Sequence, residues 1–174
     1  WLPTYVQEAR HLSPKQGALL ASLPLFMGGI GCMVSSNLSR RLATRIGIVR
    51  ARRVLAITGF IAASGSILIF TTLEDPTLAM LMLGLSGFFN DFLMPPSWTA
   101  TMDMGGRYAG TISGGMNMAG SVAGALSPLV VGYLLAGTAG NWTLTFYVTA
   151  AIYVLGAVCW LFLDSQTPIE AEGR

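Results

Sequence analysis

Asp91 is the acidic residue that lies well inside a long apolar run of this sequence, and Asn90 precedes it. A carboxylate near the centre of a bilayer costs about 2.5–3.5 kcal/mol, so Asp91 should face protein or a water-filled cavity. We predict an ion or proton site, or a polar contact that gates a cavity. A structural aspartate, hydrogen-bonded to a neighbouring helix, is the alternative, and Asn90 suits either role.

Trp98 follows Asp91 by seven residues, so an unbroken helix would place both side chains on one face. Pro95 and Pro96 lie between them and should bend the helix, because neither carries a backbone N–H. A tryptophan that faces a cavity can stack on a sugar or close a passage. A tryptophan at the membrane interface is the alternative.

A polar and small-residue stripe runs along the predicted span 109–136. Ser113, Asn117, Ser121 and Gly124 follow one another at helical spacing on one face. Asn117 has two donors and an acceptor in a span where unsatisfied polar groups are costly, so we predict that it faces a ligand. A contact between helices is the alternative. The glycines of this span are spaced for close helix approach, as Gly110 with Gly114 and Gly120 with Gly124.

No other part of the sequence carries a recognisable catalytic or metal-binding pattern. There is no nucleophile elbow, phosphate loop or paired-cysteine motif. Cys32 and Cys159 both lie in apolar runs, and His11 is predicted to be a solvated loop residue. We therefore expect no cofactor and no metal. A membrane enzyme would need clustered acids, histidines or serines at one depth, whereas Asp91 stands alone.

The elements that carry these residues are predicted to be transmembrane helices. The chain has 174 residues, of which 53% are hydrophobic and 10% are charged, against about 25% charged in soluble domains. So few charges exclude a disordered chain and disfavour a soluble enzyme. The predicted fold is an all-α bundle, and residues 1–7 would end an earlier span of a longer protein. Five complete spans are predicted, at 17–38, 54–73, 77–101, 109–136 and 142–163.

Six arginines fall between residues 40 and 53, between two of the predicted spans. A nucleic-acid patch would look similar by count. Its position between apolar runs instead favours a cytoplasmic loop, 39–53, by the positive-inside rule. Alternation of the spans then places the C-terminus inside as well. Eight basic residues lie inside by this count and two, Arg10 and Lys15, outside.

Several motifs together resemble the major facilitator superfamily, in its anion:cation symporter branch. These motifs are Trp-Leu-Pro-Thr-Tyr at 1–5, Pro-Pro-Ser-Trp at 95–98, and Gly-Gly-Arg-Tyr-Ala-Gly-Thr-Ile-Ser-Gly-x-Met-Asn at 105–117. The resemblance covers essentially the whole chain and corresponds to the C-terminal half of such a transporter, helices seven to twelve. The N-terminal half would be its partner within the same protein.

The resemblance implies movement of an organic anion by alternating access, coupled to a proton or another cation. The implied substrates are sugar acids of the hexuronate, galactonate or glucarate class, and the implied location is the bacterial cytoplasmic membrane. Ser97, Trp98 and Asn117 would line the substrate cavity by motif position. The arginines Arg40, Arg41 and Arg45 would belong to a cytoplasmic gate, although 36–39 lacks the acid that usually precedes it. A non-transporting membrane assembly or sensor module is the alternative function.

Overall fold

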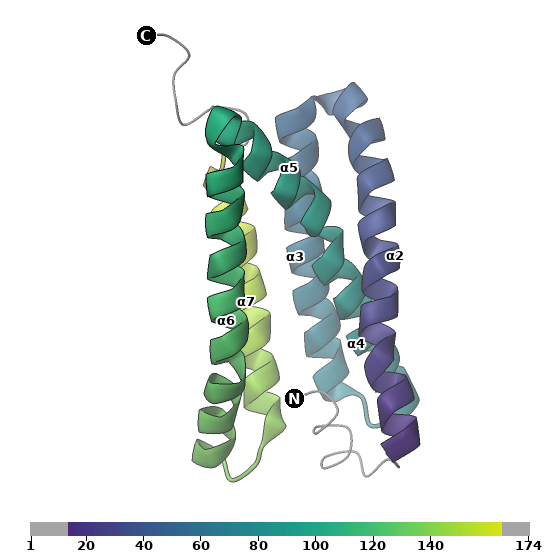
Figure 1. Ribbon diagram of the computed structural model, residues 1–174. Coiled ribbons are helices and arrows are strands. Elements are labelled where there is room, and N and C mark those ends of the chain that lie inside the picture. Colours follow the sequence, from purple (N-terminus) through teal and green to yellow (C-terminus); the bar gives the residue numbers. More distant parts are fainter. Residues whose placement is uncertain (1–13, 165–174) are drawn as a thin grey trace.

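The computed structural model describes residues 14–164, with side chains from residue 22 onward. Every regular element in this part of the chain is a helix, as predicted (Figure 1). The predicted end of an earlier span at 1–7 and His11 lie outside the described residues. The helices are α2 (Pro14–Ile46), α3 (Ile48–Thr72), α4 (Pro76–Phe92), α5 (Met94–Gly105), the 3-10 turn η1 (Gly106–Tyr108), α6 (Ala109–Gly137) and α7 (Trp142–Phe162).

Three helical stretches of the described chain are long and apolar enough to cross a membrane. They are Ile48–Thr72, Pro76–Gly137 and Trp142–Phe162. The second stretch is 62 residues long and contains α4, α5 and α6. Figure 1 shows that it reverses direction between α5 and α6. The count of five complete spans therefore stays a prediction.

The helices α3 and α4 form the centre of the bundle. The main partner of α2 is α4 and that of α7 is α3, while α6 contacts α5 and α7. The core lies where α3, α4 and α7 meet, and Phe70 packs edge-on against Phe146 with ring centroids 4.6 Å apart. A second cluster joins Ala56, Ala100 and Trp160 from α3, α5 and α7.

The predicted arginine-rich loop 39–53 is wrong in one respect, because this segment is helical on both sides of Gly47. Residues 39–46, which directly precede Gly47, are mostly good helix formers and include no proline, so α2 continues to Ile46. Gly47 has a φ of 84°, which glycine adopts readily, and the chain turns there into α3.

The proline pair interrupts the predicted span 77–101 as expected. α4 ends at Phe92 and α5 begins at Met94. Pro95 and Pro96 have no N–H to offer the carbonyl groups of Asp91 and Phe92, so the helical ladder breaks there. The segment 102–108, which lies between two predicted spans, is helical up to Gly105 and then forms the turn η1, where Gly106 has a φ of 48°.

Close helix contacts through glycine occur between α2 and α4 rather than along α6. A Cβ on Gly31 would collide with the backbone carbonyl of Phe88, and one on Gly87 with the backbone of Pro24. By contrast, a Cβ on Gly110, Gly114, Gly120 or Gly124 would meet nothing within 4 Å. The predicted close approach at these four α6 glycines is therefore not found within the described residues.

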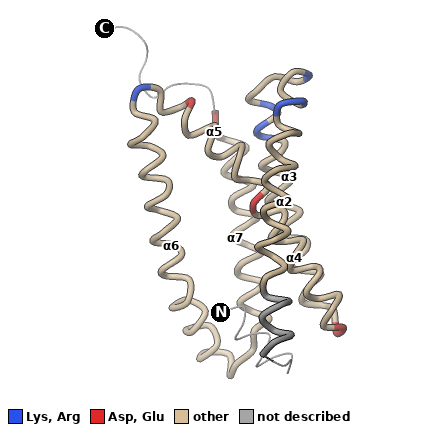
Figure 2. The backbone as a smooth tube through the Cα atoms, turned by 45° about the vertical axis from the view of Figure 1, so that its right-hand side comes forward, with Lys and Arg blue, Asp and Glu red and all other residues tan. Residues whose placement is uncertain are grey.

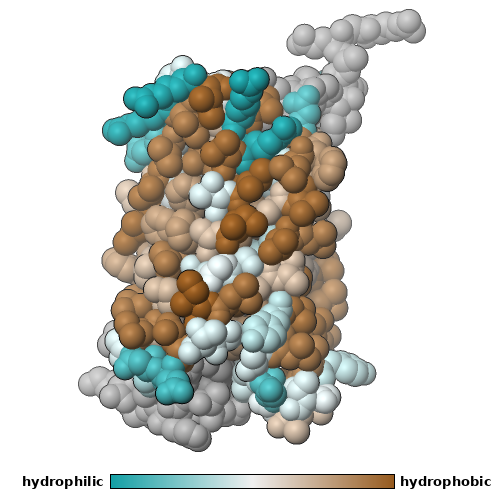
Figure 3. Space-filling view, turned by 180° about the vertical axis from the view of Figure 1, so that it is seen from behind, coloured by the Kyte–Doolittle hydropathy of each residue, from teal (hydrophilic) through white to brown (hydrophobic). Residues whose placement is uncertain are grey.

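The surface has an apolar belt between two polar ends. Figure 3 shows hydrophobic side chains over the middle of one face and hydrophilic ones towards the ends. Leu25 and Phe162 are 78% and 83% exposed, which suits contact with lipid rather than water. Figure 2 shows the described arginines gathered at one end, where α2 meets α3 and α5 meets α6, and acidic residues at the start of α4 at the other end. This pattern fits an integral membrane protein.

Candidate functional site

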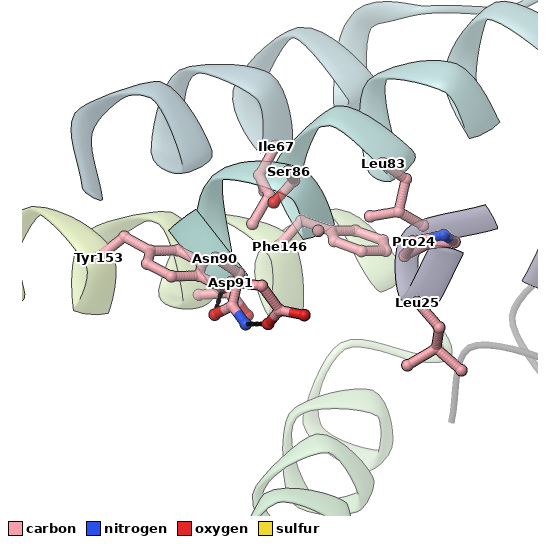
Figure 4. Close-up of a pocket in the computed structure, with 11 residues that line it drawn as sticks. Pro24, Leu25, Ile67, Leu83, Ser86, Asn90, Asp91, Phe146 and Tyr153 are labelled. Carbon is pink, nitrogen blue, oxygen red and sulfur yellow. Dashed lines mark hydrogen bonds between the residues drawn. The ribbon is translucent and has the colours of Figure 1, made fainter. Parts of the chain in front are cut away.

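A cavity of about 260 Å³ lies among α2, α3, α4 and α7. Figure 4 shows Asp91 and Asn90 on its wall, at the end of α4, with the ring of Phe146 and the side chains of Pro24 and Leu25 nearby. The structure thus places both predicted polar residues at a cavity, while their role stays a prediction. The lining residues are Pro24, Leu25, Ile67, Leu83, Ser86, Gly87, Asn90, Asp91, Phe146, Thr149 and Tyr153.

Asp91 is held by a short chain of hydrogen bonds that crosses from α4 to α7. The Tyr153 hydroxyl donates to Asn90 Oδ1 at 2.7 Å, and Asn90 Nδ2 donates to Asp91 Oδ1 at 2.9 Å (Figure 4). A Cβ on Gly28 of α2 would collide with Asp91 Oδ2, so the missing side chain of Gly28 makes room for the carboxylate. The carboxylate therefore has one oxygen fixed by an amide and the other beside α2.

The predicted substrate residues lie elsewhere. Ser97 lines a second cavity of about 240 Å³, between α5, α6 and α7, together with Met116 and Trp160. Trp98 is partly buried on α5, and Asn117 is exposed on α6. Neither lines the described wall of the cavity at Asp91. The break at Leu93 separates Trp98 from the helix of Asp91, so seven-residue spacing does not bring these two side chains together at that cavity.

The predicted polar stripe of α6 is left largely uncovered by the described helices. Asn117, Ser121 and Gly124 are exposed, and the Ser121 hydroxyl donates to the backbone carbonyl of Asn117 at 2.9 Å. The buried hydroxyl of Ser113 has no hydrogen-bond partner among the described residues. A polar face on a helix of membrane-spanning length is therefore free to meet water, a ligand or another part of the protein.

The three predicted gate arginines lie in the last turns of α2 and are exposed. Arg40 Nη2 donates to Asn37 Oδ1 at 2.9 Å, within its own helix. Arg41 lines a groove with Asn37, and Arg45 lies in the final turn.

Two other arginines make the contacts between helices at this end. Arg52 Nη2 of α3 bonds to Asp103 Oδ2 of α5 at 2.6 Å, and their side chains are 9% and 48% exposed. Arg53 Nη2 donates to the backbone carbonyl of Leu163, just after α7, at 2.9 Å. These arginines tie the start of α3 to the ends of α5 and α7, where a cation also complements the helix dipole.

Sequence reasoning missed Tyr153, Arg52, Arg53 and Asp103 as members of these contacts. Tyr153 is 63 residues from Asn90, and Asp103 is 51 residues from Arg52. No local spacing links residues so far apart. The one available signal was Asp103 itself, an acid close to the predicted arginine-rich end of the bundle.

Asp103→Asn should lower the stability of the protein, because the nearly buried guanidinium of Arg52 loses its ion pair with this carboxylate. We expect the free energy of unfolding to fall by about 2 kcal/mol, which lies between the values for exposed and fully buried ion pairs. Thermal unfolding of the full-length protein in detergent measures this. The matched control is Asp75→Asn at the other end of the bundle, where asparagine keeps the cap oxygen that accepts from Leu78 N at 2.8 Å. Equal stability of the two variants would show that the Arg52 pair contributes nothing.

Comparison with known proteins adds a family match. A family model described as "Major Facilitator Superfamily" matches residues 1–128. A "Probable sulfoacetate transporter SauU" from Cupriavidus necator is 36% identical over 98% of this chain and 40% of its own length. A "Probable L-galactonate transporter" from Escherichia coli is 23% identical over 95% of the chain and 37% of its own length.

A plant protein also matches. An "Ascorbate transporter, chloroplastic" from Arabidopsis thaliana is 26% identical over 92% of the chain and 29% of its own length. These relatives are named as transporters rather than as enzymes. The chain spans less than half the length of each relative.

Proposed function

Because this chain belongs to the Major Facilitator Superfamily, we propose that it forms the C-terminal half of a secondary transporter that moves a small organic anion by alternating access. The names of the similar proteins support an anionic substrate, since they include sulfoacetate, L-galactonate and ascorbate. We propose a sugar acid as the substrate and a proton or another cation as the coupling ion. The described helices would belong to five complete spans in a bacterial cytoplasmic membrane, with the arginine-rich end inside.

The observation that carries this proposal is the uncovered polar face of α6. Its residues Asn117 and Ser121 are exposed, although α6 lies in a stretch apolar enough to cross a membrane. Lipid offers these groups no hydrogen bonds, so the face needs water or protein beside it. Transporters built from two repeats bind their substrates between the repeats, near the middle of the membrane. We therefore assign this face to the wall of the transport path.

The proposed substrate contacts are Asn117, Ser113, Ser97 and Trp98. The amide of Asn117 and the hydroxyl of Ser97 can hydrogen-bond to substrate hydroxyls or a carboxylate, and the indole of Trp98 can stack on the carbon chain. The hydroxyl of Ser113 is buried in this packing of the helices, so it would join them in another state of the transport cycle. Ser97 lies in the cavity between α5 and α6, on the same side of the bundle as the helix that carries Ser113 and Asn117. A few such groups suffice to fix the orientation of a small ligand.

The arginine-rich end is proposed as the gate on the inner side. Arg40, Arg41 and Arg45 are exposed there, and Arg52 and Arg53 join α3 to α5 and α7. Helices tied by such contacts can separate when the contacts break, which is the usual form of a switch between two packings. The Arg52–Asp103 pair takes the place of a gate built on an acid in 36–39, where this sequence has none.

Uptake by proteoliposomes that contain the full-length protein tests the function. The panel is radiolabelled D-galactonate, D-glucuronate, D-glucarate and sulfoacetate, with D-galactose as the neutral control. We expect uptake of at least one acid above that of empty liposomes, and none of galactose. Uptake of galactose alone would contradict an anion transporter. No uptake of any compound by folded protein would favour the non-transporting module.

A further inference from the structure

We propose that the cavity at Asp91 binds a monovalent cation, a proton or Na⁺, through the Asp91 carboxylate held by Asn90 and Tyr153. Binding of the cation stands on the geometry of the cavity alone. Its use as the coupling ion rests on the proposed function. The site is separate from the proposed substrate contacts, because the described cavity wall includes neither Trp98 nor Asn117.

The first argument is the geometry of the carboxylate. Asp91 Oδ1 accepts from Asn90, whose own oxygen accepts from the Tyr153 hydroxyl. These bonds fix the side chain while leaving Oδ2 with no donor among the described residues. Gly28 gives Oδ2 its room, since any larger residue would occupy the same place. One oxygen is thus held in position and the other is available to a small ligand.

The second argument is the charge around the cavity. None of the described lining residues is basic, and Asp91 is the acidic one. From α2 and α3 the wall receives Pro24, Leu25 and Ile67, which do not titrate, and Tyr153 of α7 is the titratable neighbour. An organic anion would be repelled here, whereas a single positive charge would neutralise the carboxylate.

The third argument is the kind of cation that fits. Ser86 of α4 and Thr149 of α7, which carry hydroxyl groups, line the same cavity as Asp91. Hard cations take oxygen ligands, so carboxylate and hydroxyl oxygens suit Na⁺ as well as a proton. One carboxylate balances one positive charge. Within the described residues no group of three or more acidic, histidine or cysteine side chains could hold a multivalent metal.

The position of Asp91 links the site to the bend between α4 and α5. Asp91 is the next-to-last residue of α4, and Leu93 separates α4 from α5, which carries Ser97 and Trp98. A change of charge at Asp91 therefore occurs beside the break between the two helices, where the backbone hydrogen bonds of the helix are interrupted. Occupancy of this cavity is placed to influence the orientation of the proposed substrate contacts.

Direct binding tests the site without reference to transport. The full-length protein in detergent is titrated with acid from about pH 8 to about pH 6 in the presence of a pH-sensitive dye, a range in which an exposed aspartate stays ionised. It is also titrated with ²²Na⁺ in a scintillation proximity assay. Wild type should bind one more proton, or one more Na⁺, than Asp91→Asn, and the assay that shows the difference identifies the ion. Tyr153→Phe should weaken binding about three- to tenfold, because the fixing hydrogen bond is lost.

The matched control is Asp75→Asn, the same change at the other end of α4, which should bind as wild type does. Equal binding of both ions by wild type and Asp91→Asn would overturn the site. A loss in Asp75→Asn as large as in Asp91→Asn would also overturn it, because the effect would not be specific to the cavity.

Transport assays then test coupling. In proteoliposomes, Asp91→Asn should lose accumulation driven by a proton or Na⁺ gradient, while exchange of labelled for unlabelled anion continues. Loss of both activities in folded protein would contradict a coupling role. Cation binding without any anion uptake by wild type would refute the proposed function and leave the site standing. Anion uptake by wild type together with unchanged cation binding in Asp91→Asn would refute the site and leave the proposed function standing.

Discussion

Gly31→Ala should destabilise the helix bundle strongly, whereas Gly29→Ala, two residues earlier on the same helix, should not. A Cβ at Gly31 would collide with the backbone carbonyl of Phe88, and a backbone atom cannot rotate away as a side chain can. Forcing α2 and α4 apart should lower the stability by about 3 kcal/mol. Thermal unfolding of the full-length protein in detergent, followed by the loss of the monodisperse peak, measures the effect.

Gly29→Ala is the matched control because a Cβ there would meet nothing within 4 Å. Replacing glycine by alanine inside a helix otherwise stabilises it, by about 0.5–1 kcal/mol. The two variants should therefore shift the unfolding temperature in opposite directions. If Gly31→Ala unfolds at the same temperature as Gly29→Ala, α2 and α4 do not pack as closely as the structure has them.

Asn117→Ala should lower uptake of the transported anion without lowering the stability of the protein. A hydrogen bond to a charged group contributes about 1.5–3 kcal/mol, which corresponds to roughly a 10- to 100-fold loss of transport efficiency at about 1.4 kcal/mol per tenfold. The fold should not suffer, because the side chain is exposed and Ser121 bonds to the backbone of Asn117. Initial uptake rates over a range of anion concentrations measure the change.

Val122→Ala is the control on the same helix. Val122 is 53% exposed, and five residues at about 100° each place it on nearly the opposite face of α6 from Asn117. Its truncation should leave uptake unchanged. Trp98→Ala should also impair uptake, but Trp98 is partly buried, so its stability must be compared with that of wild type. Full activity of Asn117→Ala would remove Asn117 from the proposed substrate contacts.

Local signals in the sequence account for the correct parts of the fold. The bounds predicted for the spans 109–136 and 142–163 agree with the helices α6, Ala109–Gly137, and α7, Trp142–Phe162, while their places as separate spans stay a prediction. Both spans are continuous apolar runs, and the turn between them carries Gly140 with a φ of 84°. The break at Leu93 was predictable because prolines at 95 and 96 cannot donate to the helix.

The predictions that differ from the structure have two causes. Some depend on contacts between distant segments, and one treated a run of charged residues as a loop. Charged residues mark the end of a span, but arginine is a good helix former, so α2 continues beyond the apolar run. Which glycines face a neighbouring helix is likewise set by packing. Spacing favoured Gly110 with Gly114 on α6, whereas Gly31 and Gly87 make the close contacts between α2 and α4.

In the candidate site, too, the features set by local sequence could be predicted and those set by contacts between distant segments could not. The cost of placing a carboxylate in an apolar run predicted that Asp91 would face protein or a cavity, and it lines one. Its connection to Tyr153 could not be predicted, because α7 is brought beside α4 only by the packing of the bundle. For the same reason the sequence did not predict the ion pair of Arg52 with Asp103. The predicted gate residues were instead Arg40, Arg41 and Arg45.

Cysteine labelling at position 117 tests most directly whether the polar face of α6 lines a transport path. The background replaces Cys32 and Cys159 with serine, since both are free thiols. A membrane-impermeant methanethiosulfonate reagent should modify Asn117→Cys in the reconstituted full-length protein, and an anion that the protein transports should slow the reaction. Val122→Cys should not react, because lipid excludes the reagent. Absence of labelling at 117, or a rate that saturating anion leaves unchanged, would contradict the assignment of this face to the transport path.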